Sequence, residues 1–594
     1  MQQTEWLLEQ RYGVTTARAA KHWLSEIPIS DTRAAQHSFC ALLDELDEQA
    51  ISAGELLPIL ETLRASIIDV QAAYSARYAG KPVPLAHAER VAFDHTVALW
   101  QRLEAAYQRT AEFDWSGGVV RGDQAGDQTA QALPWQRALW CAVQRLQEYP
   151  RGHRAIPPGG WTSALRILHL AEQGAIADTP VRDRHHPKGL TTIEATFVRG
   201  LLSHAAAQLP LKEYDAACLV AQRWAHRATL MPDSPSSERT LDFAAAKRYE
   251  RDVRRMSVED ADFGLNVQRL RRALQTLISN PDSVPEDDAV LRTLPQTTAT
   301  RLLHLWNAKD PNVRQFARHR VSLAGDALSA KETIGGALRT VGVTLALDVQ
   351  TAYLIVAGTP FAPPAHVRSS LDYTREEAER LFIFQHSGNA HGEAEVGLLA
   401  ARLEAWQVLD ESATGFRLAR PLEGGAQAPA RVRAGQLVAL AMVVESIAAT
   451  GGKPAKSVPK AVPVLCVIRW VRESTGVVVE EGALPPSIEI GIELIPGEAQ
   501  GIAVALPPPP GSDATRKAQT TWTPAYTLRP KIGAGHSRVI TGAVELVLPH
   551  SALGLARVGT TLLYADADAK YQATIHEVVE RGETFDRVYA TLRH

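Results

Sequence analysis

The stretch that decides the fold of the second half of the chain is WQVLDESATGFRLARP, residues 406–421. Apolar residues alternate with polar ones on both sides of its centre, with Trp406 and Val408 before it and Phe416 and Leu418 after it. A period of two is typical of a β-strand that is buried on one face. The central letters, DESATG, contain the carboxylate, hydroxyl and glycine types that favour tight turns. We therefore predict two strands joined by a turn.

Short alternating runs surround this hairpin between residues 405 and 505. They include GQLVALAMVV, VLCVIRWVRES, IEIGIELI and GIAVAL, and connectors rich in Gly, Pro and Ser separate them. Several short strands spaced by roughly 10–20 residues are typical of a small antiparallel β-barrel or sandwich. One connector, ATGGKPAKSVPKAVP at 449–463, has the composition of a flexible loop.

Residues 1–310 follow a different pattern, in which apolar residues recur at helical spacing. Leu60, Leu63, Ile67 and Tyr74 are separated by three, four and seven positions, which places them on one face of an α-helix. Connectors rich in Pro and Gly, such as YPRGHRAIPPGG, separate further stretches of this kind. The pattern predicts an all-helical platform, either a solenoid-like array of helical hairpins or an irregular bundle.

A chain of 594 residues is too long for one hydrophobic core, so we expect a multidomain α+β protein. The segment TAYLIVAG is grouped with the strands because it is rich in apolar and β-branched residues. The segment LPPPPGSDATRKAQT is predicted as a linker, since a Pro run favours an extended conformation. The β-rich unit after it either forms its own domain, which we favour, or completes the preceding barrel. The predicted parts are a helical platform at 1–310, a β-barrel at 311–505 with an insertion at about 345–400, a Pro-rich linker at 506–520 and a C-terminal β-rich unit at 521–594.

The composition argues against several classes of protein. The 63 basic and 66 acidic residues give a net charge of −3, so a global basic field for nucleic-acid binding is absent. The four cysteines lie far apart without a C-x-x-C pair, which fits a reducing compartment and not a disulfide scaffold or zinc ribbon. The sequence has no signal-peptide pattern and no run of 18 apolar residues. We therefore expect a cytoplasmic protein without membrane insertion or a nucleic-acid partner.

Motifs for catalysis or metal binding are not found. GGKPAKS has its glycines and lysines in the wrong order for a phosphate-binding loop, and no G-x-S-x-G elbow occurs. The pairs His185–His186 and His386/His391 lack the spacing of metal ligands. We therefore predict no catalytic residues, no metal site and no enzyme.

The order of the β-motifs carries more information than any one of them. A D-x-S-x-x-G turn is followed by three further strand motifs within about 85 residues. In chain order the four motifs are Asp410-x-Ser412-x-x-Gly415, Gly435 to Val438, Val467 to Trp470, and Gly491 to Leu494. This series resembles the PilZ domain, a bacterial β-barrel that in many members binds cyclic di-GMP.

The resemblance also implies which residues would bind the dinucleotide. PilZ domains that bind it carry an R-x-x-x-R motif before the barrel, and NVRQFARHR contains Arg314 and Arg318 at that offset. A guanidinium group matches the paired acceptors of guanine and also matches phosphate. The Asp carboxylate can accept from guanine N–H groups, Ser supplies a hydroxyl and Gly allows close approach. The implied ligand residues are Arg314, Arg318, Asp410, Ser412 and Gly415.

Each of these residues also has a purely structural interpretation. Arg314 and Arg318 can form a solvated helix end, and they precede Asp410 by 96 and 92 positions, far more than in a compact PilZ domain. Asp410 and Ser412 can cap a turn in which Gly415 supplies a positive φ. For Arg469 and Arg472 we favour an exposed strand face.

The resemblance implies a cyclic di-GMP-binding effector. Its helical region would bind a protein partner and relay the second-messenger level to motility, attachment or exopolysaccharide output. The alternative is a nucleotide-independent scaffold or adaptor with a degenerate PilZ-like barrel, which the long separation of the arginines from Asp410 favours. A third alternative, an enzyme in the helical half, has no catalytic spacing to support it.

Overall fold

The fold is taken from a computed structural model of the full chain. It describes residues 12–116, 125–231, 253–259, 261–307, 319–320, 333–334, 337–338, 342–364, 396–412, 414–422, 430–444, 460–474, 478–479, 482–483, 486–507, 522–529, 543–566 and 570–593. The chain divides into two compact units, residues 1–315 and 316–594.

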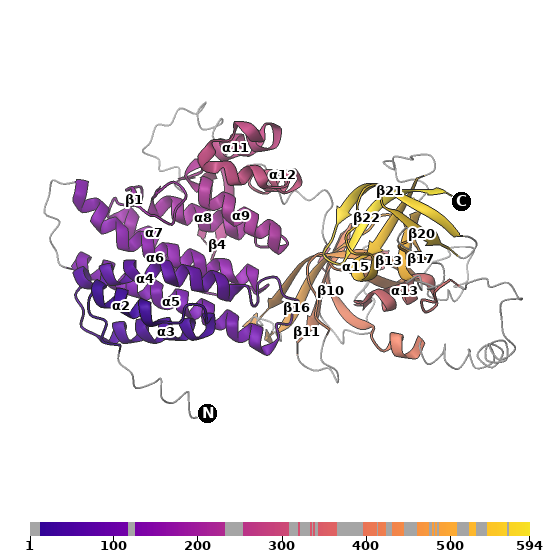
Figure 1. Ribbon diagram of the computed structural model, residues 1–594, viewed down its shortest axis with the longest axis horizontal. Helices are drawn as coiled ribbons and strands as arrows, with labels where there is room; N and C mark the ends of the chain where they lie inside the picture. The colour runs from indigo at the N-terminus through magenta and orange to yellow at the C-terminus, as the bar shows by residue number, and fades with distance from the viewer. Residues whose placement is uncertain are drawn as a thin grey trace, which may run out of the picture. The chain divides into compact units, whose positions relative to one another are not determined.

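The first unit is built mainly from α-helices (Figure 1). The helices are α2 (Ala17–Glu26), α3 (Thr32–Glu48), α4 (Ala53–Ser75), α5 (His87–Ser116), α6 (Ala125–Arg151), α7 (Thr162–Gln173), α8 (Ile193–Ala205), α9 (Leu211–Trp224), α11 (Gln268–Ser279) and α12 (Gln296–Leu305), with the 3₁₀ turns η1 (Ala225–Arg227), η2 (Pro281–Ser283) and η3 (Glu286–Thr293). The caps follow from the sequence: Asp31 accepts from two backbone N–H groups at the start of α3, and Thr192 accepts from Ala195 at the start of α8.

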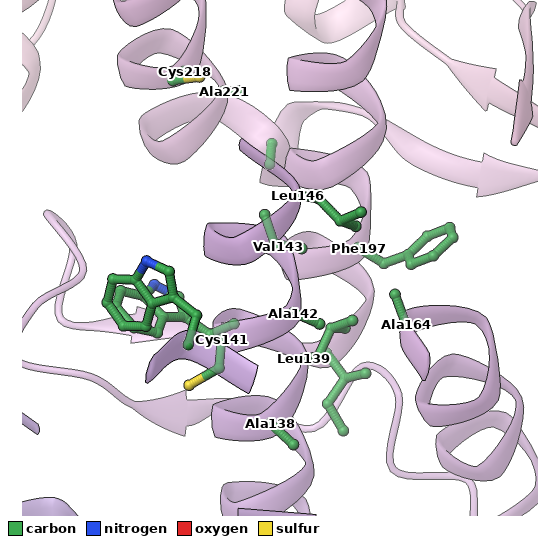
Figure 2. Packing of buried hydrophobic residues seen from close by; sticks show 14 of the residues in the cluster. Ala138, Leu139, Cys141, Ala142, Val143, Leu146, Ala164, Phe197, Cys218 and Ala221 are labelled. Atoms are coloured by element: carbon green, nitrogen blue, oxygen red, sulfur yellow. The ribbon is translucent and has the colours of Figure 1, made fainter. Parts of the chain in front are cut away.

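Helix α6 lies at the centre of this unit, where α5, α7 and α8 pack against it. Its residues Leu139, Val143 and Leu146 are buried together with Phe197 of α8 and Ala164 of α7 (Figure 2).

Cys141 of α6 and Cys218 of α9 are buried in the same core, and burial raises the pKa of both thiols. They are therefore protonated packing residues.

The prediction of an all-helical platform overlooks several short strands. Strands β1 (Val181–Arg182) and β2 (Leu190–Thr191) form a hairpin, and β3 (Thr229–Met231), β5 (Ala261–Asn266) and β4 (Val253–Val258) form a small antiparallel sheet. Strands of two to six residues are too short to show a recognisable alternation in the sequence.

The second unit contains two closed antiparallel β-barrels, which confirms the predicted fold class. The first barrel runs in the order β11 (Gly415–Pro421), β16 (Ser487–Leu494), β13 (Lys460–Ser474), β12 (Leu437–Val444), β9 (Gly342–Ala346) and β10 (Glu404–Ser412), and β10 pairs with β11 to close it. The short strand β6 (His319–Arg320) adds to β10. The predicted hairpin at 406–421 is therefore β10–β11.

The second barrel follows three residues after the first. Its order is β17 (Glu498–Ala505), β18 (Thr523–Arg529), β19 (Ala543–Pro549), β22 (Phe585–Arg593), β21 (Lys570–Arg581) and β20 (Thr561–Ala565), and β20 pairs with β17. Strand β17 belongs to this barrel, so its predicted place in the first barrel is wrong. The Pro-rich segment after β17 connects two strands of one barrel and not two domains. The prediction of an interdomain linker fails here because proline content indicates local chain stiffness and not which strands pair. The remaining short elements are β7 (Thr333–Ile334), β8 (Ala337–Leu338), β14 (Val478–Val479), β15 (Gly482–Ala483) and α15 (His550–Leu553).

The segment TAYLIVAG is a helix and not a strand. Helix α13 (Val349–Ala357) begins after Asp348, whose carboxylate accepts from two backbone N–H groups, and ends at Gly358 in the left-handed conformation. These two caps outweigh the β-branched content. Helix α13 packs against strands of both barrels, and Ala352 shares a buried cluster with Val467 of the first barrel and Phe585 of the second. The two barrels therefore share part of their core.

Among the described helices, none is both long and apolar enough to cross a membrane. All four cysteines are free.

Candidate functional site

The predicted motif lies at the end of the β10–β11 hairpin of the first barrel. Ser412 is paired with Gly415 across the hairpin, and the Ser412 hydroxyl donates to the Gly415 carbonyl at 3.2 Å. A Cβ atom at position 415 would lie 2.0 Å from the carbonyl oxygen of Ile492 on β16. Gly415 is therefore required by close contact with a neighbouring strand. The prediction of a positive φ at Gly415 is wrong, because the φ angle of this residue lies outside the left-handed region.

Asp410 occupies an irregular position in β10. The register shifts between Val408 and Asp410, so Leu409 is an extra residue that has no partner on β11. The Asp410 residue is only 8% exposed, and its carboxylate forms an ion pair with Arg417 of β11 at 3.8 Å. The bulge thus places the Asp410 carboxylate against the cationic side chain of Arg417. The role of Asp410 is therefore more than the capping of a turn.

Three charged residues beside Asp410 complete a cluster that sequence analysis did not identify. Arg417 and Arg472 both donate to the same Glu489 oxygen, at 2.8 and 2.7 Å. Burial acts to raise the pKa of Glu489, but the two guanidinium groups outweigh it and the pKa lies below its usual range. The arginine side chains are 33% and 41% exposed. This corner of the barrel, formed by Asp410, Arg417, Arg472 and Glu489, is called the Asp410 corner below.

Strand β6 lies directly against the Asp410 corner. His319 and Arg320 pair with Glu411 and Asp410 of β10. Strand β9 pairs with the same edge of β10 further from the turn, so β6 extends that edge to Asp410. Arg314 and Arg318 lie outside the described residues.

Two other residues of the predicted motif series have structural roles. A Cβ atom at Gly491 would lie 2.0 Å from the indole nitrogen of Trp470, so glycine is needed for the packing of this tryptophan. Arg469 is not on a free strand face: it donates to Glu493 at 2.6 Å and bonds Glu580 of the second barrel. The motif therefore also contributes to the contact between the two barrels.

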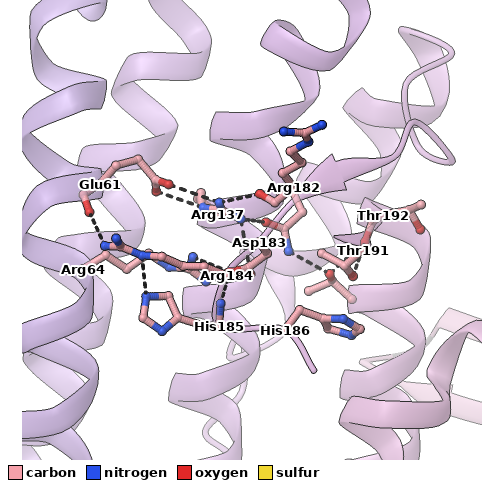
Figure 3. A network of polar contacts seen from close by, with 12 residues as sticks. Glu61, Arg64, Arg137, Arg182, Asp183, Arg184, His185, His186, Thr191 and Thr192 are labelled. Atoms are coloured by element: carbon pink, nitrogen blue, oxygen red, sulfur yellow. Dashed lines mark hydrogen bonds and ion pairs between the residues drawn. The ribbon is translucent and has the colours of Figure 1, made fainter. Parts of the chain in front are cut away.

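A second polar site lies inside the helical unit (Figure 3). Arg64 of α4 forms two parallel hydrogen bonds to the carboxylate of Asp183, at 2.7 and 2.9 Å, and both side chains are 1% exposed. Arg137 of α6 lies 3.3 Å from Asp183 and forms a second pair with Glu61 at 2.9 Å. We call these four residues the ion network.

The ion network compensates its own charges and holds the β1–β2 hairpin in place. Burial acts to raise the pKa of Asp183, but the hydrogen bonds of Arg64 and the charges of Arg64 and Arg137 lower it well below its usual range. Asp183 also accepts from the backbone N–H of His185 at 2.9 Å, and its own N–H donates to Gly189. Arg64 lies 4.5 Å above the ring of Trp140. The network therefore fixes the loop between β1 and β2.

The histidines of this loop do not form a metal site. His186 Nε2 bonds the carbonyl of Gln222 at 2.9 Å, and in the part of the chain that the structure describes no group of three or more His, Cys, Asp or Glu side chains could hold a metal ion. His386 and His391 lie outside the described residues.

Comparison with known proteins bears on the helical unit. Residues 18–235 match the family model described as "Cyclic-di-GMP receptor FimW, N-terminal domain". The match spans α2 to α9 and includes the ion network, and it ends before both barrels. No curated protein and no solved structure matches this chain. The helical segment 18–235 is thus similar to the N-terminal domain of a cyclic-di-GMP receptor, which agrees with the predicted class of the chain.

Proposed function

We propose that the Asp410 corner is the site at which this receptor binds cyclic di-GMP, in the manner of PilZ domains. The observation that carries the proposal is the pairing of β6 with β10. His319, the first residue of β6, directly follows Arg318 in the chain. The pairing of β6 with β10 at Asp410 supports a site shared with the R-x-x-x-R motif, although 92 positions separate Arg318 from Asp410 in the sequence.

The chemistry of the corner suits a guanine dinucleotide. Arg314 and Arg318 would supply guanidinium groups for the guanine edges and phosphates. Asp410 would accept from guanine N–H groups, and the half-buried Arg417 and Arg472 add positive charge beside it.

The position of the motif also suggests how the signal is passed on. Arg314 and Arg318 belong to the segment that links the helical unit to the first barrel in the chain. A ligand that holds both arginines would favour one arrangement of that segment over others. The helical unit would then engage a protein partner in a ligand-dependent way.

Titration calorimetry of the full chain with cyclic di-GMP tests the site. We expect micromolar binding by the wild type, and binding weakened at least about 10-fold in Arg314→Ala, Arg318→Ala and Asp410→Ala, because each removes a charge-assisted hydrogen bond. Arg557→Ala is the matched control, since Arg557 is an exposed arginine of the second barrel. Wild-type affinity in both Arg314→Ala and Asp410→Ala would exclude this site.

One observation favours the alternative of an adaptor with a degenerate barrel. Asp410 is only 8% exposed and already forms an ion pair with Arg417. If this pair is structural, Asp410→Ala will lower the midpoint of thermal unfolding of the barrel unit and the full chain will give no heat with cyclic di-GMP. The calorimetric titration and an unfolding curve of the same variant therefore separate the two functions.

A further inference from the structure

A pocket of about 520 Å³ lies in the helical unit, behind the β1–β2 hairpin. Its lining comes from the first turn of α8, the end of α9, and the loop fixed by the ion network. Arg199 and Trp140 are buried and form its floor, and the exposed residues Lys188, Leu190 and His226 lie at its mouth. This volume is in the range of pockets that hold small organic molecules.

Arg199 in the floor of the pocket is a buried cation without a counter-charge. The residue is 8% exposed, and within the residues that the structure describes no carboxylate lies within 4.0 Å of its guanidinium. It donates to the amide oxygen of Gln147 at 3.1 Å, and turning over the amide of Gln144 places a second amide oxygen 3.1 Å from Nη1. The Arg199 Nε atom is buried without a hydrogen-bond partner. A guanidinium that is buried without a carboxylate is costly for the folded state.

The mouth of the pocket adds further positive charge. Lys188 Nζ lies 3.5 Å from His226 Nε2 and 3.7 Å from Asp288. Asp288 is shared with Arg223 and with the Trp224 indole, so it does not neutralise Lys188 alone. The lining carboxylate is Glu194, and one of its oxygens accepts from the backbone N–H of Leu230 at 3.0 Å. The balance at the pocket is therefore positive.

The titration behaviour of the pocket agrees with this balance. Burial lowers the pKa of Arg199 to about 10. Partial burial of its imidazole also lowers the pKa of His226, and Lys188 and Arg227 add to the effect, against the opposing charge of Asp288. Both shifts mean that the protein groups around the pocket disfavour positive charge, and an anion in the pocket would raise both pKa values.

We propose that this pocket binds a small phosphate ester whose phosphate group is held by Arg199 and Lys188. Guanidinium and ammonium groups are the side chains that bind phosphate best, and the N-terminal turn of α8, which borders the pocket, favours an anion. The apolar lining residues Trp140, Pro180 and Leu190 would contact the organic part of the ligand. The proposal goes beyond cyclic di-GMP binding at the Asp410 corner and does not depend on it.

Titration calorimetry of the full chain in chloride buffer, with inorganic phosphate, GMP and cyclic di-GMP as separate probes, tests the pocket. We expect heat with inorganic phosphate, and tighter binding of GMP if a nucleoside is the organic part. Arg199→Met should weaken binding of phosphate at least about 10-fold and Lys188→Gln by a smaller factor, since each removes a charged donor. Arg166→Gln, which removes an exposed arginine on α7, should leave it unchanged.

The two sites are separated by repeating the titrations in Asp410→Ala. Phosphate binding that persists in Asp410→Ala and is lost in the double variant Asp410→Ala/Arg199→Met assigns it to the helical unit. Cyclic di-GMP binding that is lost in Arg199→Met and kept in Asp410→Ala would make the dinucleotide itself the ligand of this pocket. Equal phosphate binding by wild type and Arg199→Met, or no heat with phosphate or GMP at millimolar concentration, would overturn the proposal. A far-ultraviolet circular dichroism spectrum of each variant shows that the helical unit is folded.

Discussion

The ion network and the pocket floor bury the same chemical group in two ways. Arg64 and Arg199 are both buried arginines of the helical unit, with residue exposures of 1% and 8%. Arg64 meets the carboxylate of Asp183 with two parallel hydrogen bonds. Arg199 meets only neutral amide oxygens, whereas the Nε atom is buried without a hydrogen-bond partner in both arginines.

This difference separates a structural charge from one that is available to a ligand. A buried ion pair loses its hydration but recovers most of that cost through Coulomb attraction and hydrogen bonds. Arg199 cannot release its proton at neutral pH, so its cost remains until an anion binds. A third case is His153, a buried base for which burial lowers the pKa to about 4. His153 avoids the cost by staying neutral, which arginine cannot do.

The largest effect is expected when the ion network loses its carboxylate. Asp183→Asn leaves Arg64 and Arg137 buried without a full counter-charge, and we expect it to lower the free energy of unfolding by about 3–5 kcal/mol. Urea unfolding of the full chain, followed by circular dichroism at the helical band, measures this change. The matched control is Asp44→Asn, because Asp44 forms an exposed pair with Arg102 and its loss should cost less than about 1 kcal/mol. Equal losses in both variants would show that the network does not stabilise the unit.

Lowering the pH should reveal the effect of the buried, neutral His153 on stability. The folded pKa of His153 is about 4 and the unfolded value is about 6.5, so the unfolded chain binds a proton first as the pH falls. The stability present above pH 6.5 is therefore lost progressively down to about pH 4, by up to about 3 kcal/mol. His153→Asn should remove this part of the pH dependence, since Asn tolerates the left-handed backbone at this position.

The measurement for His153 is urea unfolding at several pH values between 7.5 and 4. His169→Gln serves as the control, because His169 is an exposed histidine on α7. An unchanged slope of stability against pH in His153→Asn, relative to wild type, would contradict the assignment.

The hairpin that opens the first barrel could be predicted because its information is local. Trp406, Val408, Phe416 and Leu418 alternate along the chain, and all four are buried. Gly415 was also identified, but the physical reason was wrong. The residue that excludes a side chain there is Ile492, which lies 77 positions away in the sequence (492 − 415) and could not be connected with it before the strand register was known.

The charged sites escaped prediction for the same reason. Arg64 and Asp183 are separated by 119 positions, and Arg417 and Glu489 by 72. Arginine and carboxylate residues are frequent at protein surfaces, so only burial marks these pairs as unusual. Arg199 gives an even weaker signal in the sequence, because its distinguishing feature is the absence of a nearby carboxylate. The assignment of β17 to the second barrel likewise depends on pairing with β18 and β20.

The smallest expected effect is that of Arg199→Met on stability. It decides the comparison between Arg64 and Arg199, because this variant should not be less stable than the wild type. Replacing Arg199 by Met removes a buried charge that lacks a counter-charge, and we expect the free energy of unfolding in chloride buffer to stay equal or to rise by about 1 kcal/mol. Arg145→Met is the matched variant: Arg145 is a buried arginine on α6 that pairs with the buried Glu104 at 3.0 Å. Its loss leaves a buried carboxylate and should cost about 3 kcal/mol or more. The same urea titrations measure both changes.

A loss of stability in Arg199→Met as large as that in Arg145→Met would mean that amide oxygens alone stabilise a buried guanidinium as well as a carboxylate does. Arg199 would then be a structural residue like Arg64, and the pocket would lose its argument for an anion.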